Sequence, residues 1–187
     1  MRPKWLALSA AVTILIGGIS YSLWHGSAVA KAAGTTSVAI AKKVSIFPAV
    51  GHMAPNFALK TLSGKTVSLK SLRGKPVYVN FWATWCTYCK AELQAIQRLH
   101  QHYGKKLVIL GVDLTASEKS PQAVAQFVTQ QKLTYDILLD TTGSVANQYL
   151  VRAAPTSVFV NPKGLITTFF VGQMSHSQMV KAYRSAK

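Results

Sequence analysis

The feature that most constrains this chain is a pair of cysteines, Cys86 and Cys89, placed between two segments of different pattern. Residues Pro76 to Ala83 (PVYVNFWA) form a β-branched and aromatic run, which predicts a buried strand. Residues Thr87 to Tyr103 carry apolar side chains at helical spacing, and Gly104 follows as a stop signal. Sites in α/β sheets collect where the carboxyl end of a strand meets the amino end of a helix, so this junction is the candidate site.

The segments around the junction predict an α/β fold with a mixed central sheet flanked by helices. Phe57 to Lys60 and Thr66 to Leu69 flank a turn that contains Gly64, which indicates an N-terminal β-hairpin. Further strands are expected at Leu107 to Val112, Ile137 to Leu139, Ser157 to Val160 and Leu165 to Val171, and further helices from Ser120 and from about Ser175 to Ala186.

The amino terminus predicts a membrane anchor. Residues 5–24 contain no charged side chain and match the roughly 20 residues that a transmembrane helix needs. Arg2 and Lys4 precede this stretch, which favours a cytoplasmic start and an exported remainder. We therefore expect a cytoplasmic start at 1–4, a transmembrane signal anchor at 5–24, an extracytoplasmic tether at 25–52 and one domain at 53–187.

A cleavable signal peptide is the alternative to an anchor, because Ala28-Val29-Ala30 has the small-residue pattern of a cleavage site. The apolar stretch is longer than the core of an ordinary signal peptide, which favours the retained anchor. The protein is then a single-pass protein of the cell membrane with its domain on the extracytoplasmic side, or a secreted protein if cleavage follows Ala30.

The cysteine spacing itself predicts thiol chemistry. Two cysteines are too few for a disulfide scaffold or for a four-cysteine zinc site. In the first turn of a helix, partial positive charge and free N–H groups favour a thiolate at Cys86, which makes it the expected nucleophile. Cys89 lies one turn further in and is expected to resolve the mixed disulfide by pairing with Cys86.

Glu92 is a second candidate, because it is one of only five acidic residues in the chain. Its helical neighbours three and four residues away carry no positive charge, so a helical salt bridge does not explain it. It falls on the apolar stripe beside Cys89, where burial would raise its pKa and suit it to exchange protons with the inner thiol. The alternative is a carboxylate that reaches solvent or assists the first turns of the helix.

Pro155 is the third candidate, just before the expected strand at Ser157 to Val160. A proline at the start of a strand can be purely structural. A cis peptide bond there would instead leave neighbouring backbone groups free to pair with an extended partner chain across from the sulfurs.

Taken together, these motifs resemble the thioredoxin superfamily, specifically its membrane-anchored TlpA/ResA-like branch. The matching residues are Phe81 to Cys89 (FWATWCTYC), Glu92 and Ala154-Pro155-Thr156, and the segment from Ala54 to Pro76 is similar to the amino-terminal hairpin of that branch. The resemblance implies a thioredoxin fold, a cis bond before Pro155 and thiol–disulfide exchange outside the cytoplasm. We expect the substrate groove to involve Trp85, Ala154, Pro155 and Thr156.

The resemblance also implies partners. Electrons are expected from a membrane thiol donor, and the targets are protein thiols and disulfides, with apocytochrome c or other secreted proteins among them. The chain is expected to need no cofactor and no metal and to act as a monomer. This predicts a thiol–disulfide oxidoreductase of the protein-disulfide reductase type, with its direction left open.

Three positions depart from the pattern. Thr87-Tyr88 between the cysteines lacks the proline that is common at the second position, so the family's redox potential cannot be transferred. Leu93-Gln94 stands where family members often place a proline. Asn80 occupies the position of a buried aspartate in cytoplasmic thioredoxins, which leaves Glu92 as the one acid expected near the cysteines.

Other classes of site fit less well. A copper carrier of the same fold is the main alternative, although such carriers resemble C-x-x-x-C and His176 is the one histidine after residue 102. A zinc site with His100 and His102 is disfavoured, because helical residues two apart face different ways. A peroxiredoxin would need a proline and a threonine where Val79 and Ala83 stand.

The net charge of +16 arises mainly from a shortage of acidic residues, since 21 basic residues face only 5 acidic ones. The basic residues are spread along the chain without a recognition motif, so nucleic acid is not an expected partner. A chain with few carboxylates to protonate should lose little stability in acid, which favours an acidic exterior. Attraction to anionic lipid headgroups is the alternative.

Overall fold

The computed structural model describes residues 48–187. The predicted anchor at 5–24 and most of the predicted tether lie outside these residues. Within the described part, no helix combines the length and the apolar character that crossing a membrane requires.

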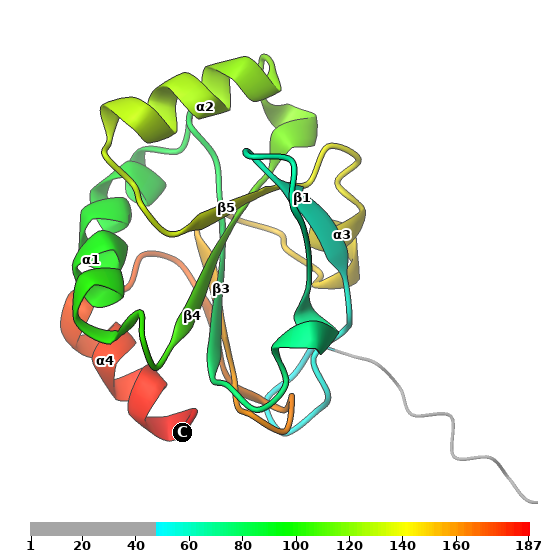
Figure 1. Ribbon diagram of the computed structural model, residues 1–187, viewed down its shortest axis with the longest axis vertical. Coiled ribbons are helices and arrows are strands. Elements are labelled where there is room, and N and C mark those ends of the chain that lie inside the picture. The colour runs from blue at the N-terminus through cyan, green and yellow to red at the C-terminus, as the bar shows by residue number, and fades with distance from the viewer. Residues whose placement is uncertain (1–47) are drawn as a thin grey trace, which may run out of the picture. The chain divides into compact units, whose positions relative to one another are not determined.

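The described residues build one seven-stranded mixed sheet in the order β2-β1-β5-β4-β3-β6-β7 (Figure 1). Its central strands β3, β4 and β5 are parallel, and every other neighbouring pair is antiparallel. The strands are β1 (Ala58–Thr61), β2 (Thr66–Ser68), β3 (Val77–Trp82), β4 (Val108–Asp113), β5 (Asp136–Leu139), β6 (Thr156–Val160) and β7 (Ile166–Val171).

Strand β3 lies near the middle of the sheet and is buried along its whole length. Successive side chains of a strand point to opposite faces, so a strand covered on both sides is expected to be mainly apolar. Tyr78 and Trp82 pack in the core on one face, and Val79 and Phe81 pack in the core on the other. This packing on both faces fixes the carboxyl end of β3, and the cysteine pair follows it after a short turn.

Helices cover both faces of the sheet (Figure 1). One core joins the sheet to α1 (Thr87–Tyr103), α2 (Pro121–Gln130) and α4 (His176–Ser185), and the other includes α3 (Ser144–Gln148). Ser120 caps α2, and Ser175 with Gln178 forms a capping box at the start of α4. These caps explain why both helices begin where the sequence places a serine.

This architecture confirms the predicted thioredoxin-like α/β fold with a mixed central sheet and flanking helices. The bounds of α1 are those predicted, and the helix continues without a break through Leu93-Gln94. The short helix α3 and the 3-10 turns η1 (Leu69–Leu72) and η2 (Thr115–Ser117) were not predicted. Elements of three to five residues are too short for a periodic apolar pattern to reveal them.

Candidate active site

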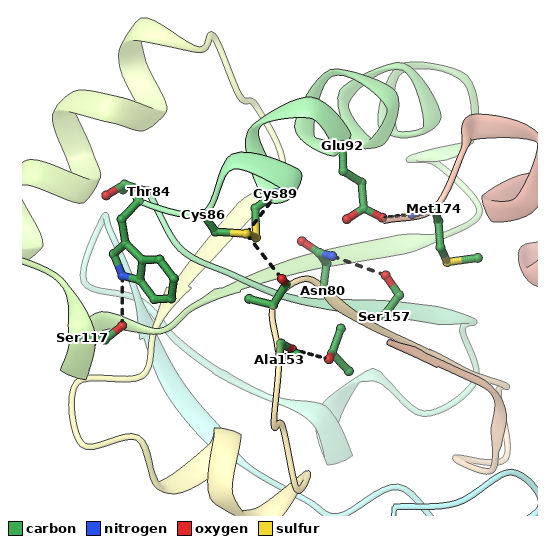
Figure 2. The surroundings of a disulfide bond; sticks show 12 residues. Asn80, Thr84, Cys86, Cys89, Glu92, Ser117, Ala153, Ser157 and Met174 are labelled. Atoms are coloured by element: carbon green, nitrogen blue, oxygen red, sulfur yellow. Dashed lines mark hydrogen bonds between the residues drawn. A yellow bond between two sulfur atoms is a disulfide. The ribbon is translucent and has the colours of Figure 1, made fainter. Parts of the chain in front are cut away.

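The cysteine pair lies in the first turn of α1, directly after the carboxyl end of β3 (Figure 2). Cys86 occupies the N-cap position of the helix, and its sulfur accepts a hydrogen bond from the backbone N–H of Cys89 at 3.1 Å. The two sulfurs are joined in a disulfide. The predicted Cys86–Cys89 pairing is confirmed, and in the reduced state the same N–H and the helix dipole favour a thiolate at Cys86.

The two sulfurs differ in access to solvent. Cys86 retains 6% of its surface, whereas Cys89 is fully buried. The flanking aromatic residues are exposed, Trp85 by 57% and Tyr88 by 69%. An incoming protein thiol or disulfide can therefore reach the outer sulfur and meets two exposed aromatic rings beside it.

The loop before β6 lies against the disulfide. The Ala154-Pro155 peptide bond is cis, as the resemblance implied. The carbonyl oxygen of Ala154 lies 3.5 Å from the sulfur of Cys86, and the hydroxyl of Thr156 donates to the carbonyl of Ala153 at 2.7 Å. The structure thus brings Ala154 and Pro155 to the sulfurs from a position almost 70 residues further along the chain.

Glu92 is buried behind the disulfide, on the same face of α1 as Cys89 (Figure 2). Its Oε1 accepts a hydrogen bond from the backbone N–H of Met174 at 3.0 Å, and its Oε2 has no partner among the described residues. Burial raises the pKa of Glu92 to about 7, while the hydrogen bond from Met174 and the nearby amide of Asn80 offset part of the rise. A carboxyl group with this pKa can hold or release a proton near neutral pH.

A small polar cluster lies beneath Glu92 on the central strands. Asn80 donates through Nδ2 to the hydroxyl of Ser157 at 3.4 Å, and Tyr78 shares a 2.9 Å hydrogen bond with the same hydroxyl. All three side chains are buried. A buried polar group costs free energy unless it is hydrogen-bonded, so this cluster gives Glu92 a polar surface inside an otherwise apolar core.

A groove of about 420 Å³ lies on the other side of Trp85. Its walls come from the end of β4, from η2, from α3 and from the chain after α3, and carry no charged side chain. Of the four residues predicted to form a substrate groove, Trp85 lines this groove, whereas Ala154, Pro155 and Thr156 do not. The carbonyl of Ala154 lies against the sulfur of Cys86 instead.

Two of the histidines lie far from the cysteines. His100 and His102 are in the last turn of α1, about 21 Å and about 24 Å along the helix axis from Cys86. His176 begins α4. Within residues 48–187, no three His, Cys, Asp or Glu side chains converge closely enough to hold a metal ion.

The sequence did not point to the loop after β4. Glu118 in that loop accepts hydrogen bonds from Thr84, two residues before Cys86, and Ser117 accepts one from the indole N–H of Trp85. Asp113 at the end of β4 is buried nearby. Its place directly after an apolar run was a usable signal, because the carboxyl ends of parallel strands meet at one edge.

Comparison with known proteins places this geometry in a family. A family model described as AhpC/TSA matches residues 50–169. The chain is 37% identical to thioredoxin-like protein YneN of Bacillus subtilis (strain 168) over 179 residues, which cover 96% of each chain. It is 30% identical to thiol-disulfide oxidoreductase ResA of Bacillus cereus over 168 residues, 89% of this chain and 87% of the relative.

A solved structure agrees with the sequence relatives. The crystal structure of StoA from Bacillus subtilis superposes with a TM-score of 0.62 at 31% identity and covers 68% of this chain and 96% of that chain. The match therefore extends over nearly the whole of StoA.

The raised pKa of Glu92 predicts how stability depends on pH. Because the folded-state pKa lies above the unfolded value, this proton stabilises the native state fully below about pH 4, and that stability is lost as pH rises through about 7. Glu92→Gln mimics the protonated group and should be more stable than the wild type at pH 8, by on the order of 3 kcal/mol, with the gap closing by pH 4. Denaturant unfolding of both oxidised proteins at pH 8 and pH 4 measures this difference in the free energy of unfolding.

The exposed acid Asp136 supplies the control. Asp136→Asn removes the same formal charge far from the disulfide and should leave the pH dependence unchanged. Unfolding free energies of wild type and Glu92→Gln that run parallel from pH 8 to pH 4 would contradict the assigned burial effect.

Proposed function

The chain belongs to the AhpC/TSA family and is a thiol–disulfide oxidoreductase of thioredoxin-like fold, and we propose that it acts outside the cytoplasm as a membrane-tethered reductant of protein disulfides. The observation that carries the proposal is the asymmetry of the cysteine pair. Cys86 stands at a helix N-terminus with 6% of its surface exposed, whereas Cys89 is fully buried, one helical turn before the buried Glu92.

The first step is attack by Cys86. In the reduced enzyme, the Cys86 thiolate attacks one sulfur of a substrate disulfide, so that a mixed disulfide forms and one substrate thiolate leaves. The N–H of Cys89 and the dipole of α1 stabilise the thiolate before attack. The exposed rings of Trp85 and Tyr88 provide apolar surface for the substrate chain around the reacting sulfurs.

The second step is resolution by Cys89. Its thiol gives up a proton and attacks the sulfur of Cys86, which releases the second substrate thiolate and leaves the enzyme disulfide. Glu92, with a pKa of about 7, takes this proton and returns one when the disulfide is reduced again. Two electrons have then moved from the enzyme dithiol to the substrate.

The loop around Pro155 binds the substrate backbone. An extended chain that presents its cysteine to Cys86 passes close to Ala154, whose carbonyl lies 3.5 Å from that sulfur. Backbone pairing of this kind selects extended segments rather than one side-chain sequence. This suits an enzyme whose targets are several secreted proteins, apocytochrome c among them.

Location and electron supply follow from the amino-terminal segment. Residues 5–24, preceded by Arg2 and Lys4, support a single membrane span with the domain outside. An exported dithiol cannot draw on cytoplasmic reductants directly, so the disulfide must be reduced again by a thiol donor in the membrane. The domain is proposed to work as a monomer at 53–187, on a tether at 25–52.

Cysteine variants test the order of attack. Cys86→Ser is expected to abolish reduction of a protein disulfide, whereas Cys89→Ser should accumulate a mixed disulfide through Cys86, because the resolving thiol is missing. Non-reducing electrophoresis with mass spectrometry identifies the trapped sulfur and partner. Full reductase activity in Cys86→Ser, or trapping through Cys89 instead, would refute the assignment.

The reduction potential tests the direction. A reductant is expected to lie at or below about −200 mV, the range of glutaredoxins and thioredoxin, whereas an oxidase of the DsbA type lies near −120 mV. Equilibration of the full-length protein with glutathione buffers, read by alkylation of free thiols, gives the value. A potential near that of DsbA would leave the exchange chemistry intact and overturn the reductant role.

A further inference from the structure

The few acidic residues of the chain gather near the active site. Of five carboxyl groups, Glu92 lies behind the disulfide, and Asp113, Glu118 and Asp140 lie near one another at the carboxyl ends of β4 and β5 and in the loop after β4. Asp136 is the one that is exposed. A chain that uses acids so rarely places three of them beside the turn that leads to Cys86, although the exchange steps above use none of the three.

Glu118 holds this turn through two short hydrogen bonds. Its Oε1 accepts from the backbone N–H of Thr84 at 2.5 Å, and its Oε2 accepts from the hydroxyl of Thr84 at 2.6 Å. Hydrogen bonds to a charged carboxylate are stronger than those between neutral groups. Both oxygens of one side chain thus bind a single residue that is 34 positions away in the sequence.

A third contact joins the same two segments. The indole N–H of Trp85 donates to the hydroxyl of Ser117 at 3.3 Å (Figure 2). That hydroxyl donates in turn to the carbonyl of Leu114 at 2.7 Å. Strand β3 ends at Trp82, so Thr84 has no strand partner of its own. The loop after β4 therefore supplies the hydrogen bonds that a continued strand would have made.

Asp113 is a buried acid close to Glu118. It is fully buried, its Oδ1 accepts from the hydroxyl of Thr115 at 2.6 Å, and its Oδ2 has no hydrogen-bond partner among the described residues. Burial raises the pKa of Asp113 to about 7, and the charges of Glu118 and Asp140 add to the rise. Asp113 therefore keeps its proton at higher pH than an exposed aspartate does.

The other groups around Asp113 are uncharged. Its partners across the sheet are Trp82 on β3 and Leu139 on β5. Among the acids, Asp140 accepts a hydrogen bond from the backbone N–H of Ala146 at 2.8 Å, so it is held on the far side by the start of α3. Glu118 is left as the acid that faces the active-site turn.

We propose that Glu118 is a positioning residue that fixes Thr84 and the adjoining Trp85 and so holds the Cys86 thiol at the helix N-terminus. The inference rests on the proposed role of Cys86 as the attacking thiol. Glu118 acts through the turn and not on the substrate. Without the hydrogen bonds to Glu118, Cys86 can move out of the N-cap position, where the helix dipole stabilises its thiolate. The side chain of Trp85 can then also move away from the groove that it lines.

Three variants of the full-length protein separate positioning from charge. Glu118→Ala removes both acceptors, whereas Glu118→Gln removes the charge but keeps an acceptor for the Thr84 N–H and a donor for its hydroxyl. Asp136→Asn removes one exposed acid elsewhere. The readouts are kcat/KM for reduction of a protein disulfide, the rate of Cys86 alkylation by iodoacetamide as a function of pH, and hydrogen exchange of the Thr84 amide.

Glu118→Ala is expected to lower kcat/KM on the order of tenfold, to slow Cys86 alkylation at neutral pH and to speed exchange of the Thr84 amide. Glu118→Gln should restore most of each loss, and Asp136→Asn should match the wild type. If Glu118→Gln and Glu118→Ala had equal effects, the charge of Glu118 would matter and its hydrogen bonds with Thr84 would not. That result would overturn the proposal.

A lowered unfolding midpoint in Glu118→Ala with an unchanged alkylation profile would make the residue merely structural and would also overturn the proposal. Failure of the underlying function has a different signature. If Cys86 of the wild type is not the alkylated thiol, the nucleophile is misassigned before any variant is compared.

Discussion

The chemistry of this protein depends on one constraint, the placement of Cys86 as the N-cap of α1. The sulfur of Cys86 accepts the hydrogen bond that a serine or aspartate oxygen accepts at the start of other helices. The same sulfur therefore caps the N-terminus of α1. Strand β3 can deliver it there because its buried side chains lock the strand into both cores. Access, thiolate stability and proximity to Cys89 all follow from this position.

Two of the five acidic residues of the chain are buried near Cys86. Glu92 and Asp113 are buried, and burial raises the pKa of each to about 7. Protons on such groups stabilise the folded state as the pH falls, which is the opposite of ordinary paired carboxylates. The shortage of acids and the burial of these two therefore both reduce the stability that the folded protein should lose in acid.

Much of the fold and the outer part of the site could be predicted from the sequence. Long apolar periodicities located α1 and the central strands, and the C-x-x-C spacing with Glu92 and Pro155 located residues that the structure brings to one candidate site. The two hydrogen bonds from Thr84 to Glu118 could not be predicted, because they connect residues 34 positions apart through a loop without a periodic pattern. The short helix α3, which forms a groove wall, was missed for the same lack of pattern.

The titration of the two thiols tests the account most directly. In the reduced full-length protein, alkylation followed by mass spectrometry at a series of pH values reports Cys86 and Cys89 separately. The account predicts that Cys86 ionises at lower pH than Cys89, and that Glu92→Gln lowers the pKa of Cys89 while moving that of Cys86 less, because a neighbouring negative charge is removed. A Cys89 titration that is the same in both proteins, or a Cys86 thiol that ionises last, would contradict it.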